Sequence, residues 1–259
     1  MTPGTSLTIV QLTDCHVFTD PAGVLRDVAT RPRLRQVIED VRARVPDFDL
    51  LVVTGDTAHD EAHETYEAFR DELGTRLDRL RIVPGNHDDR ASLRRVFPEA
   101  CEAIADRVGF VVETEDWLVI GLDSQQTGED AGELGSEQLA WLRDRLAAAP
   151  TRSAVVFLHH PPIEVGSLWL DAIGLLDTRE LEAVLVEHPR VNAVIAGHVH
   201  QEASGRCGGT HAYTSPAVGP QFRPYQDTLV IEPGPPGYRI IELHHAGDSS
   251  TIVVRCANT

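Results

Sequence analysis

The 259-residue chain contains no lysine, so all 23 of its basic side chains are arginine, against 40 acidic side chains. The net charge of −17 argues against sequence-independent binding to a nucleic-acid polymer, because such binding needs a basic face. Two explanations of the missing lysines stay open. One is the codon usage of a GC-rich genome, and the other is adaptation to high salt, where screening makes a strongly negative surface tolerable.

Long apolar runs, Cys-x-x-Cys spacing and a recognisable leader are also missing. The apolar runs are short, as at residues 50–53 and 154–158, which excludes a membrane-spanning helix. The four cysteines, at positions 15, 101, 207 and 256, lie far apart, so we expect free thiols in a reducing compartment. Residues 1–6 have neither the basic nor the apolar segment of a signal peptide, so we expect a cytoplasmic protein with no membrane partner.

Short apolar runs rich in β-branched residues and bounded by glycine, proline or polar residues predict strands. These runs cover residues 7–12, 50–53, 80–83, 118–122, 154–158 and 191–196. Amphipathic patterns between the runs predict helices over residues 33–44 and 61–73, and two more that begin at Ser136 and Thr178. Strands that alternate with helices predict an α/β architecture.

The pattern changes after residue 202. Residues 203–259 are punctuated by glycine and proline and predict strands at 211–214, 228–231, 238–244 and 251–254. No linker, repeat or low-complexity segment interrupts the chain, so we expect one domain over residues 1–259. In this domain an α/β part, residues 1–202, is followed by a β-rich part, residues 203–259, that completes a second, more antiparallel sheet.

Five of the predicted strands end in Asp, Asn or His, and ligands of α/β proteins bind outside the carboxyl ends of the strands. The residues at these ends are Asp14 with His16, Asp56, Asn86 with His87, His159, and His198 with His200. In each pair spaced by two, the side chains point to the same face of an extended chain, so both can reach one metal cluster. A neighbour such as His160 should face the opposite way.

These ligand types favour first-row divalent ions. Mixed oxygen and imidazole ligands suit Mn²⁺, Fe²⁺ or Zn²⁺, and the absence of thiolate ligands argues against a structural zinc site. The candidates are too many for one tetrahedral ion but suit two ions about 3.5–4 Å apart, the arrangement of phosphoester-cleaving sites. Gly55, Gly85 and Gly197 lie beside these residues, where the backbone must turn sharply or approach an ion closely. A lone D-x-H is more often a turn than a ligand, but five such motifs in order favour a metal site.

The motifs resemble those of the calcineurin-like metallophosphoesterases. D-x-H, G-D, G-N-H-D, H-H and G-H-x-H occur between residues 14 and 200. The resemblance implies a four-layer αββα sandwich with two mixed β-sheets and a dinuclear site that takes manganese, iron (Fe²⁺ or Fe³⁺) or zinc. It implies that one ion is held by Asp14, His16, Asp56 and His200. The second would be held by Asp56, Asn86, His159 and His198, with Asp56 bridging and His87 as the nearby catalytic histidine.

Further motifs are similar to the bacterial class III 3′,5′-cyclic-AMP phosphodiesterases, over nearly the whole chain. They include L-D-S-Q from Leu122, H-H-P-P from His159, G-H-V-H-Q-E from Gly197 and Q-F-R-P from Gln221. This resemblance implies hydrolysis of 3′,5′-cyclic AMP to AMP by attack of a hydroxide held between the two ions. In it Asn86 stabilises the charge on the phosphoryl oxygens and His87 donates a proton to the leaving oxygen. A homodimer is expected from the relatives only.

Four further positions are candidates for contact with the substrate. Trp169 and Phe222 are candidates for the base and ribose, with packing in the core as the alternative. Arg223 is the first candidate for a cation that contacts the phosphate or base. His59 stands three residues after Asp56, where relatives often carry a carboxylate or amide near the catalytic histidine, so its presence predicts a different polarity there.

Three other functions stay open. A broader phosphodiesterase would act on 2′,3′-cyclic nucleotides or glycerophosphodiesters. A DNA nuclease with the same metal core is disfavoured by the acidic charge, and a non-catalytic scaffold is disfavoured by the complete ligand set. An acidic chain can still attract a small anionic diester, because the attraction of bound metal ions is local.

Overall fold

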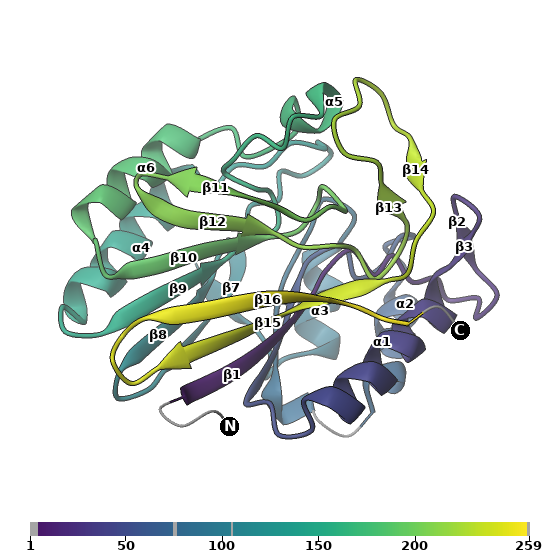
Figure 1. Ribbon diagram of the computed structural model, residues 1–259, viewed down its shortest axis with the longest axis horizontal. Helices are drawn as coiled ribbons and strands as arrows, with labels where there is room; N and C mark the ends of the chain where they lie inside the picture. The colour runs from purple at the N-terminus through teal and green to yellow at the C-terminus, as the bar shows by residue number, and fades with distance from the viewer. Residues whose placement is uncertain (1–4, 75–76, 105, 258–259) are drawn as a thin grey trace.

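The computed structural model describes residues 5–74, 77–104 and 106–257, and two large sheets dominate it (Figure 1). The five-stranded sheet consists, in spatial order, of β16 (Ser249–Arg255), β15 (Gly237–His244), β1 (Thr5–Leu12), β4 (Leu50–Thr54) and β5 (Leu80–Val83). The seven-stranded sheet consists of β11 (Ala203–Cys207), β12 (Thr210–Thr214), β10 (Val191–Ala196), β9 (Ser153–Phe157), β8 (Trp117–Gly121), β7 (Arg107–Glu113) and β6 (Glu102–Ile104).

Both sheets are mixed, as the sequence predicted. In the first, β1, β4 and β5 run parallel, whereas β15 is antiparallel to β1 and β16 to β15. In the second, β8, β9, β10 and β12 run parallel, and β6, β7 and β11 are antiparallel to their neighbours. The parallel strands of each sheet place their carboxyl ends at one edge, where the predicted ligands lie.

The side chains alternate along the central strands and so divide the core into layers. Ile9 of β1 and Phe157 of β9 share an apolar cluster between the two sheets. Val10 and Leu12 face the other side of β1, in a cluster with the helices that cover this sheet. Val156 of β9 belongs to a third cluster under the helices of the second sheet. The two sheets therefore pack face to face.

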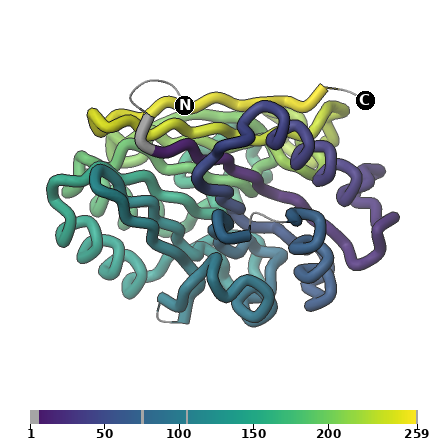
Figure 2. The backbone as a smooth tube through the Cα atoms, turned by 90° about the horizontal axis from the view of Figure 1, so that it is seen from below, coloured from purple at the N-terminus to yellow at the C-terminus, as the bar shows by residue number. Residues whose placement is uncertain are grey.

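Helices cover the outer face of each sheet. α1 (Thr30–Arg44), α2 (His63–Leu73) and α3 (Arg90–Val96) pack on the five-stranded sheet, and α4 (Gly135–Ala148) and α6 (Thr178–Glu187) pack on the seven-stranded sheet. In Figure 2 the purple-blue coils of α1 and the teal coils of α4 lie on opposite sides of the strands. The order helix, sheet, sheet, helix is the predicted αββα sandwich.

The prediction for residues 203–259 is wrong in one respect. β11 and β12 extend the seven-stranded sheet, but β15 and β16 join β1 in the other sheet, so this part completes both sheets and not one. The strand predicted at 228–231 is reduced to β14 (Ile231–Glu232), which pairs only with β13 (Gln221–Phe222). The Pro-Gly-Pro-Pro run that follows β14 cannot supply a full set of ladder donors.

Three smaller elements surround the ligand-bearing edge. They are the hairpin of β2 (Val24–Leu25) and β3 (Val28–Ala29), the short helix α5 (Leu168–Asp171) and the β13–β14 ribbon. All four cysteines are free thiols, as expected. Among the described residues, no helix has the length and apolar character needed to cross a membrane.

Candidate functional site

The loops after β1, β4 and β10 bring a first group of ligand atoms together, with Asp14, His16, Asp56 and His200 all within 4.8 Å of one another. His16 Nε2 lies 3.4 Å from Asp56 Oδ2, and His200 Nε2 lies 3.3 Å from Asp14 Oδ1. The two imidazole nitrogens lie 3.2 Å apart. Four donor atoms from three loops thus surround one small volume.

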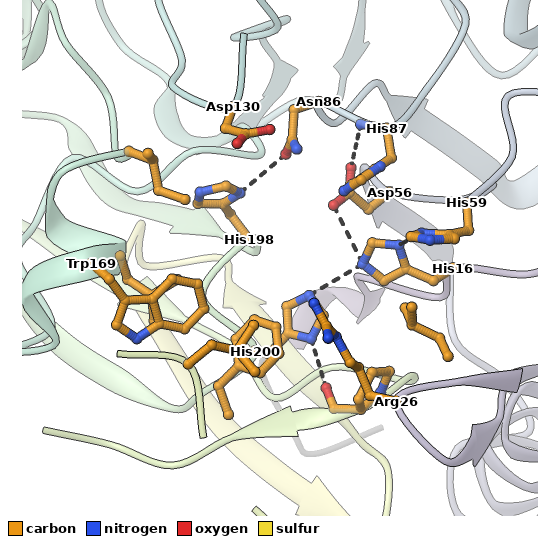
Figure 3. A pocket seen from close by; sticks show the side chains of 16 residues that line it. His16, Arg26, Asp56, His59, Asn86, His87, Asp130, Trp169, His198 and His200 are labelled. Atoms are coloured by element: carbon orange, nitrogen blue, oxygen red, sulfur yellow. Dashed lines mark hydrogen bonds and ion pairs between the residues drawn. The ribbon is translucent and has the colours of Figure 1, made fainter. Parts of the chain in front are cut away.

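A second group adjoins the first through Asp56. His159 Nε2 lies 3.5 Å from the same Oδ2 of Asp56 and 3.1 Å from Asn86 Oδ1. His198 Nδ1 lies 3.2 Å from Asn86 Oδ1 and 3.2 Å from His159 Nε2. Because one carboxylate oxygen contacts both groups, Asp56 is the residue that can be shared between two ions. Figure 3 shows the members of both groups that line the pocket, namely His16, Asp56, Asn86, His198 and His200.

The backbone at these residues differs from the extended chain that the two-residue spacing suggested. Asp14, His16, Asp56, His198 and His200 all have positive φ, between 44° and 68°. The paired side chains therefore converge because the loop turns through left-handed conformations, not because a strand continues. Such conformations are costly for residues with a Cβ and concentrate at functional sites.

Two of the predicted glycines are needed for close approach. A Cβ on Gly85 would meet the backbone nitrogen and carboxylate of Asp56, and one on Gly197 would meet Thr13 Oγ1 and the carboxylate of Asp14. Each glycine thus lets one loop carrying candidate ligands lie directly on another.

Burial and neighbouring charges set the protonation states of the buried groups. Burial alone would raise the pKa of Asp14, but the charge of His200 and a hydrogen bond to it outweigh burial and lower the pKa. At Asp56 burial is outweighed in the same way by His159 and His16, and the pKa falls well below the usual value. Burial lowers the pKa of His16 and of His198 to about 3, so both imidazoles are neutral at pH 7.

Hydrogen bonds outside the two groups fix the ring orientations. His159 Nδ1 donates to Thr54 O at 2.7 Å, and His200 Nδ1 donates to Pro220 O at 2.6 Å. Each bond turns Nε2 toward the carboxylates, as is usual for metal-binding histidines. Burial would lower the pKa of His159, but the charge of Asp56 and a hydrogen bond to it outweigh burial and raise the pKa to about 9, so a bound ion would displace a proton there. A mixed set of carboxylates, imidazoles and one amide oxygen, without a thiolate, fits two divalent ions of the manganese, iron or zinc type.

Asp88 holds the loops after β4 and β5 together. Its buried carboxylate accepts from the backbone nitrogens of Thr57, Ala58 and Gly85 at 2.9 to 3.2 Å. These bonds join the loop that carries Asp56 to the loop that carries Asn86. Asp88 therefore positions the candidate ligands without being one.

The sequence predicted that His160 faces away from the second group, but its ring lies 4.6 Å from that of His198, and ligand atoms of His159, His160 and His198 lie within 4.8 Å of one another. His160 Nδ1 lies 2.8 Å from Ser124 Oγ and its Nε2 lies 3.1 Å from Asp130 O, so both nitrogens are engaged. The ring fits because residue 132 is glycine, where a Cβ would overlap the imidazole.

His87 and His59 form a wall of the pocket beside the first group. Their ring centroids lie 4.9 Å apart, and the ring of His87 lies 5.1 Å from that of His16. His59 Nδ1 lies 3.3 Å from His16 Nδ1. The histidine at position 59 thus does contact the residue expected to act as the proton donor, and it adds an imidazole where a carboxylate or amide was the common alternative.

The pocket over both groups has a volume of about 290 Å³ and an aromatic side. Phe222 stacks on His200 with ring planes 8° apart and centroids 4.1 Å apart, and Trp169 meets Phe222 edge-on at 5.1 Å. Both aromatic residues also pack in a small apolar cluster with Leu170 and Val199. Both residues therefore pack in the core and line the pocket, and their contact with the base and ribose of a substrate stays a prediction.

Arg223 does not line this pocket, and its prediction as the substrate cation is not supported. Its guanidinium lies at the surface and pairs with Glu232 across the β13–β14 ribbon at 2.7 Å. Successive residues of a strand face opposite sides, so Phe222 faces the pocket and Arg223 does not. Two charged residues that the sequence did not single out, Arg26 and Asp130, line the pocket instead (Figure 3).

The family model described as calcineurin-like phosphoesterase matches residues 7–202, which carry every predicted ligand. The chain belongs to this family. The phosphoesterase is 36% identical, over 97% of its length and 90% of the relative's, to the 3′,5′-cyclic adenosine monophosphate phosphodiesterase CpdA of Escherichia coli K12. It is 34% identical to the CpdA of Pseudomonas aeruginosa, over 98% of this chain and 92% of that one.

A cyanobacterial relative has a related name. The 3′,5′-cyclic-nucleotide phosphodiesterase alr5338 of Nostoc is 30% identical, over 96% of this phosphoesterase and 92% of the relative. Among solved structures, a dimetal phosphatase from Danio rerio superposes with a TM-score of 0.67 at 16% identity, covering 98% of this chain and all of that one. At this identity the superposition shows that the fold is shared.

Proposed function

We propose that this phosphoesterase hydrolyses 3′,5′-cyclic AMP to AMP with two divalent metal ions. The observation that carries the proposal is the pair of ligand groups that share one oxygen of Asp56 beneath a single pocket. The substrate is suggested by the relatives named for cyclic-AMP hydrolysis, which align over nearly the whole chain. A small phosphodiester is therefore the expected partner.

The proposed ligand sets follow the two groups. One ion takes Asp14, His16, Asp56 and His200, and the other takes Asp56, Asn86, His159 and His198. Manganese, iron or zinc fits this oxygen and imidazole set. Two ions at these ligands would supply Lewis acidity to the phosphoryl oxygens and lower the pKa of water.

In this proposal the side chain of Asn86 orients the phosphoryl group and the side chain of His87 supplies a proton. The amide of Asn86 lies at the edge of the second group, where it can stabilise charge on a phosphoryl oxygen. The backbone N–H of His87 donates to Asp56 Oδ1 at 3.0 Å, which fixes the loop and leaves the imidazole on the pocket wall. We propose that this imidazole donates a proton to the 3′-oxygen as it leaves.

The aromatic side suits the rest of the nucleotide. Trp169 and Phe222 offer ring faces and edges beside His200, and an adenine base can stack on such a surface. His59 changes the polarity around His87, so a broader phosphodiesterase, active on 2′,3′-cyclic nucleotides or glycerophosphodiesters, is the second candidate. A cytoplasmic location and a homodimer complete the proposal, and the free thiols suit a reducing compartment.

A substrate panel tests the proposal. The Mn²⁺-loaded protein is assayed with 3′,5′-cyclic AMP, 2′,3′-cyclic AMP, bis-p-nitrophenyl phosphate, a glycerophosphodiester and a DNA oligonucleotide. We expect the highest kcat/KM for 3′,5′-cyclic AMP and none for DNA. Faster turnover of 2′,3′-cyclic AMP would favour the broader enzyme, and a metal-loaded protein that cleaves no diester would refute the proposal.

A further inference from the structure

The pocket is lined by one permanently charged cation, at least among the described residues. Arg26 lies at the tip of the β2–β3 hairpin, whereas the other basic groups that line the pocket are histidines. In Figure 3 its side chain reaches in beside His200, across the pocket from Asn86 and Asp130. A guanidinium at this position faces the space above both ligand groups.

The hairpin turn holds Arg26 in a conformation that arginine rarely adopts. Leu25 pairs with Val28, which leaves Arg26 and Asp27 as a two-residue loop, with φ of 50° and 64°. Positive φ at both central residues is the type I′ geometry, in which asparagine and glycine are favoured. The geometry of this turn does not favour arginine. Residues held in such strained conformations concentrate at functional sites, which is a reason to look for a function of Arg26.

The base of the hairpin is packed and anchored. Gly23 lies against Phe18 so closely that a Cβ would overlap the ring, and its N–H donates to Asp20 O at 2.9 Å. Phe18 in turn meets the ring of His59 at 5.1 Å. The hairpin is thus fixed to the same wall that carries His59, and its tip is directed over the pocket.

Arg26 also differs from the neighbouring arginines in its pairing. Arg31 and Arg35 both pair with Glu72, at 2.7 and 2.6 Å, and Arg33 donates to a backbone carbonyl. For the Arg26 side chain, no hydrogen bond or ion pair is found within the described part of the chain.

We infer that Arg26 binds the phosphoryl group of the substrate through its non-bridging oxygens. This inference rests on the proposed phosphodiesterase function and names the cation that the function lacked once Arg223 was found to pair elsewhere. In a chain without lysine, only an arginine can supply a fixed positive charge, and a guanidinium can donate two parallel hydrogen bonds to one phosphoryl group. The anion is thereby held from above while the ligand groups lie below it.

The test compares three variants of the Mn²⁺-loaded protein. Arg26→Asn removes the charge with a residue that suits the left-handed turn, Arg26→Lys retains the charge, and Arg223→Gln removes a surface arginine outside the pocket. KM and kcat are measured with 3′,5′-cyclic AMP, and the inhibition constant is measured for inorganic phosphate. Thermal unfolding and metal content are recorded for each variant.

We expect Arg26→Asn to raise both KM and the phosphate inhibition constant about tenfold, because a charge-assisted bond to the anion is lost. Arg26→Lys should recover part of this loss, and Arg223→Gln should match the wild type. Unchanged constants in Arg26→Asn would overturn the inference. So would equal losses in Arg26→Asn and Arg26→Lys that come with a lower Tm, because the arginine would then act only on the turn.

The inference and the proposed function fail separately. If the wild type cleaves no phosphodiester, the function is wrong, but binding of inorganic phosphate to the metal-loaded protein can still be measured by calorimetry. Weaker phosphate binding in Arg26→Asn then supports the contact without the activity. If the wild type cleaves cyclic AMP and Arg26→Asn does so with the same KM, only the inference is wrong.

Discussion

The pocket has a floor and a rim that are built in different ways. The floor consists of the seven proposed ligands, Asp14, His16, Asp56, Asn86, His159, His198 and His200. All but Asn86 are buried, and they lie at the ends of strands in the two central sheets. The rim consists of Arg26, Asp130, Trp169 and Phe222, which lie on short elements and loops and are exposed or half-buried. The floor is fixed by the fold, whereas the rim depends on local turns.

This difference has a physical cause. Several independent constraints fix each floor residue, because close backbone contacts, hydrogen bonds and burial together hold the strained conformations in place. A rim residue such as Arg26 is held only by a two-residue turn and the packing beneath it. We therefore expect the floor to set the chemistry and the rim to set which diester binds. The predictions below test this division, from the largest effect to the smallest.

Removing the shared carboxylate should have the largest effect. Asp56→Asn leaves the shape but halves the charge available to two ions, and we expect kcat to fall more than about a hundredfold, beyond the usual effect of residues outside the ligand set. Metal content should fall with it. Asp227→Asn, an exposed position on the β13–β14 loop, is the matched control. An Asp56→Asn protein with full activity would show that the ligand groups are not catalytic.

Removing the proposed proton donor should lower activity less than removing the shared carboxylate does. In His87→Ala we expect kcat to fall about 10²- to 10⁴-fold, the usual contribution of a general acid, while metal content stays at the wild-type value. His245→Ala, which removes an exposed histidine paired with Asp116, serves as the control. Equal loss of metal and activity would instead make His87 a ligand, and unchanged turnover would remove it from the mechanism.

A rim substitution should change binding and not chemistry. Phe222→Leu keeps an apolar side chain but loses the stack on His200, and we expect KM for cyclic AMP to rise about tenfold with little change in kcat, since base stacking is worth about 1–3 kcal/mol. The smaller bis-p-nitrophenyl phosphate should be affected less. Tyr225→Leu, at an exposed aromatic, is the comparison. A lower Tm with unchanged KM would favour packing alone.

The sequence predicted which strand ends meet at the floor, because each combined an apolar run with a polar motif, whereas binding of metal by these residues stays a prediction. The predicted runs at 7–12, 80–83 and 191–196 end within the range of β1, β5 and β10. Some further elements had signals that went unused. Asp89 caps α3 by accepting from Ser92 N at 2.7 Å, a spacing visible in the sequence.

The rim could not be predicted in the same way. Arg223 and Arg26 are both arginines beside apolar residues, and only the pairing of β13 with β14 and the turn at residues 26–27 decide which one faces the pocket. A φ near 50° at an arginine leaves no trace in composition or periodicity. Likewise, the prediction that residues 203–259 complete only the second sheet was wrong for β15 and β16, because hydropathy does not reveal which sheet a strand joins.

The central claim, that Asp56 is shared between two ions, is tested most directly on Mn²⁺-loaded protein by metal analysis with electron paramagnetic resonance. We predict about two manganese ions per chain and the spectrum of an exchange-coupled pair, as expected for ions about 3.5–4 Å apart. In Asp56→Asn the coupled signal should be lost. A single uncoupled ion in the fully active wild-type protein would contradict the account.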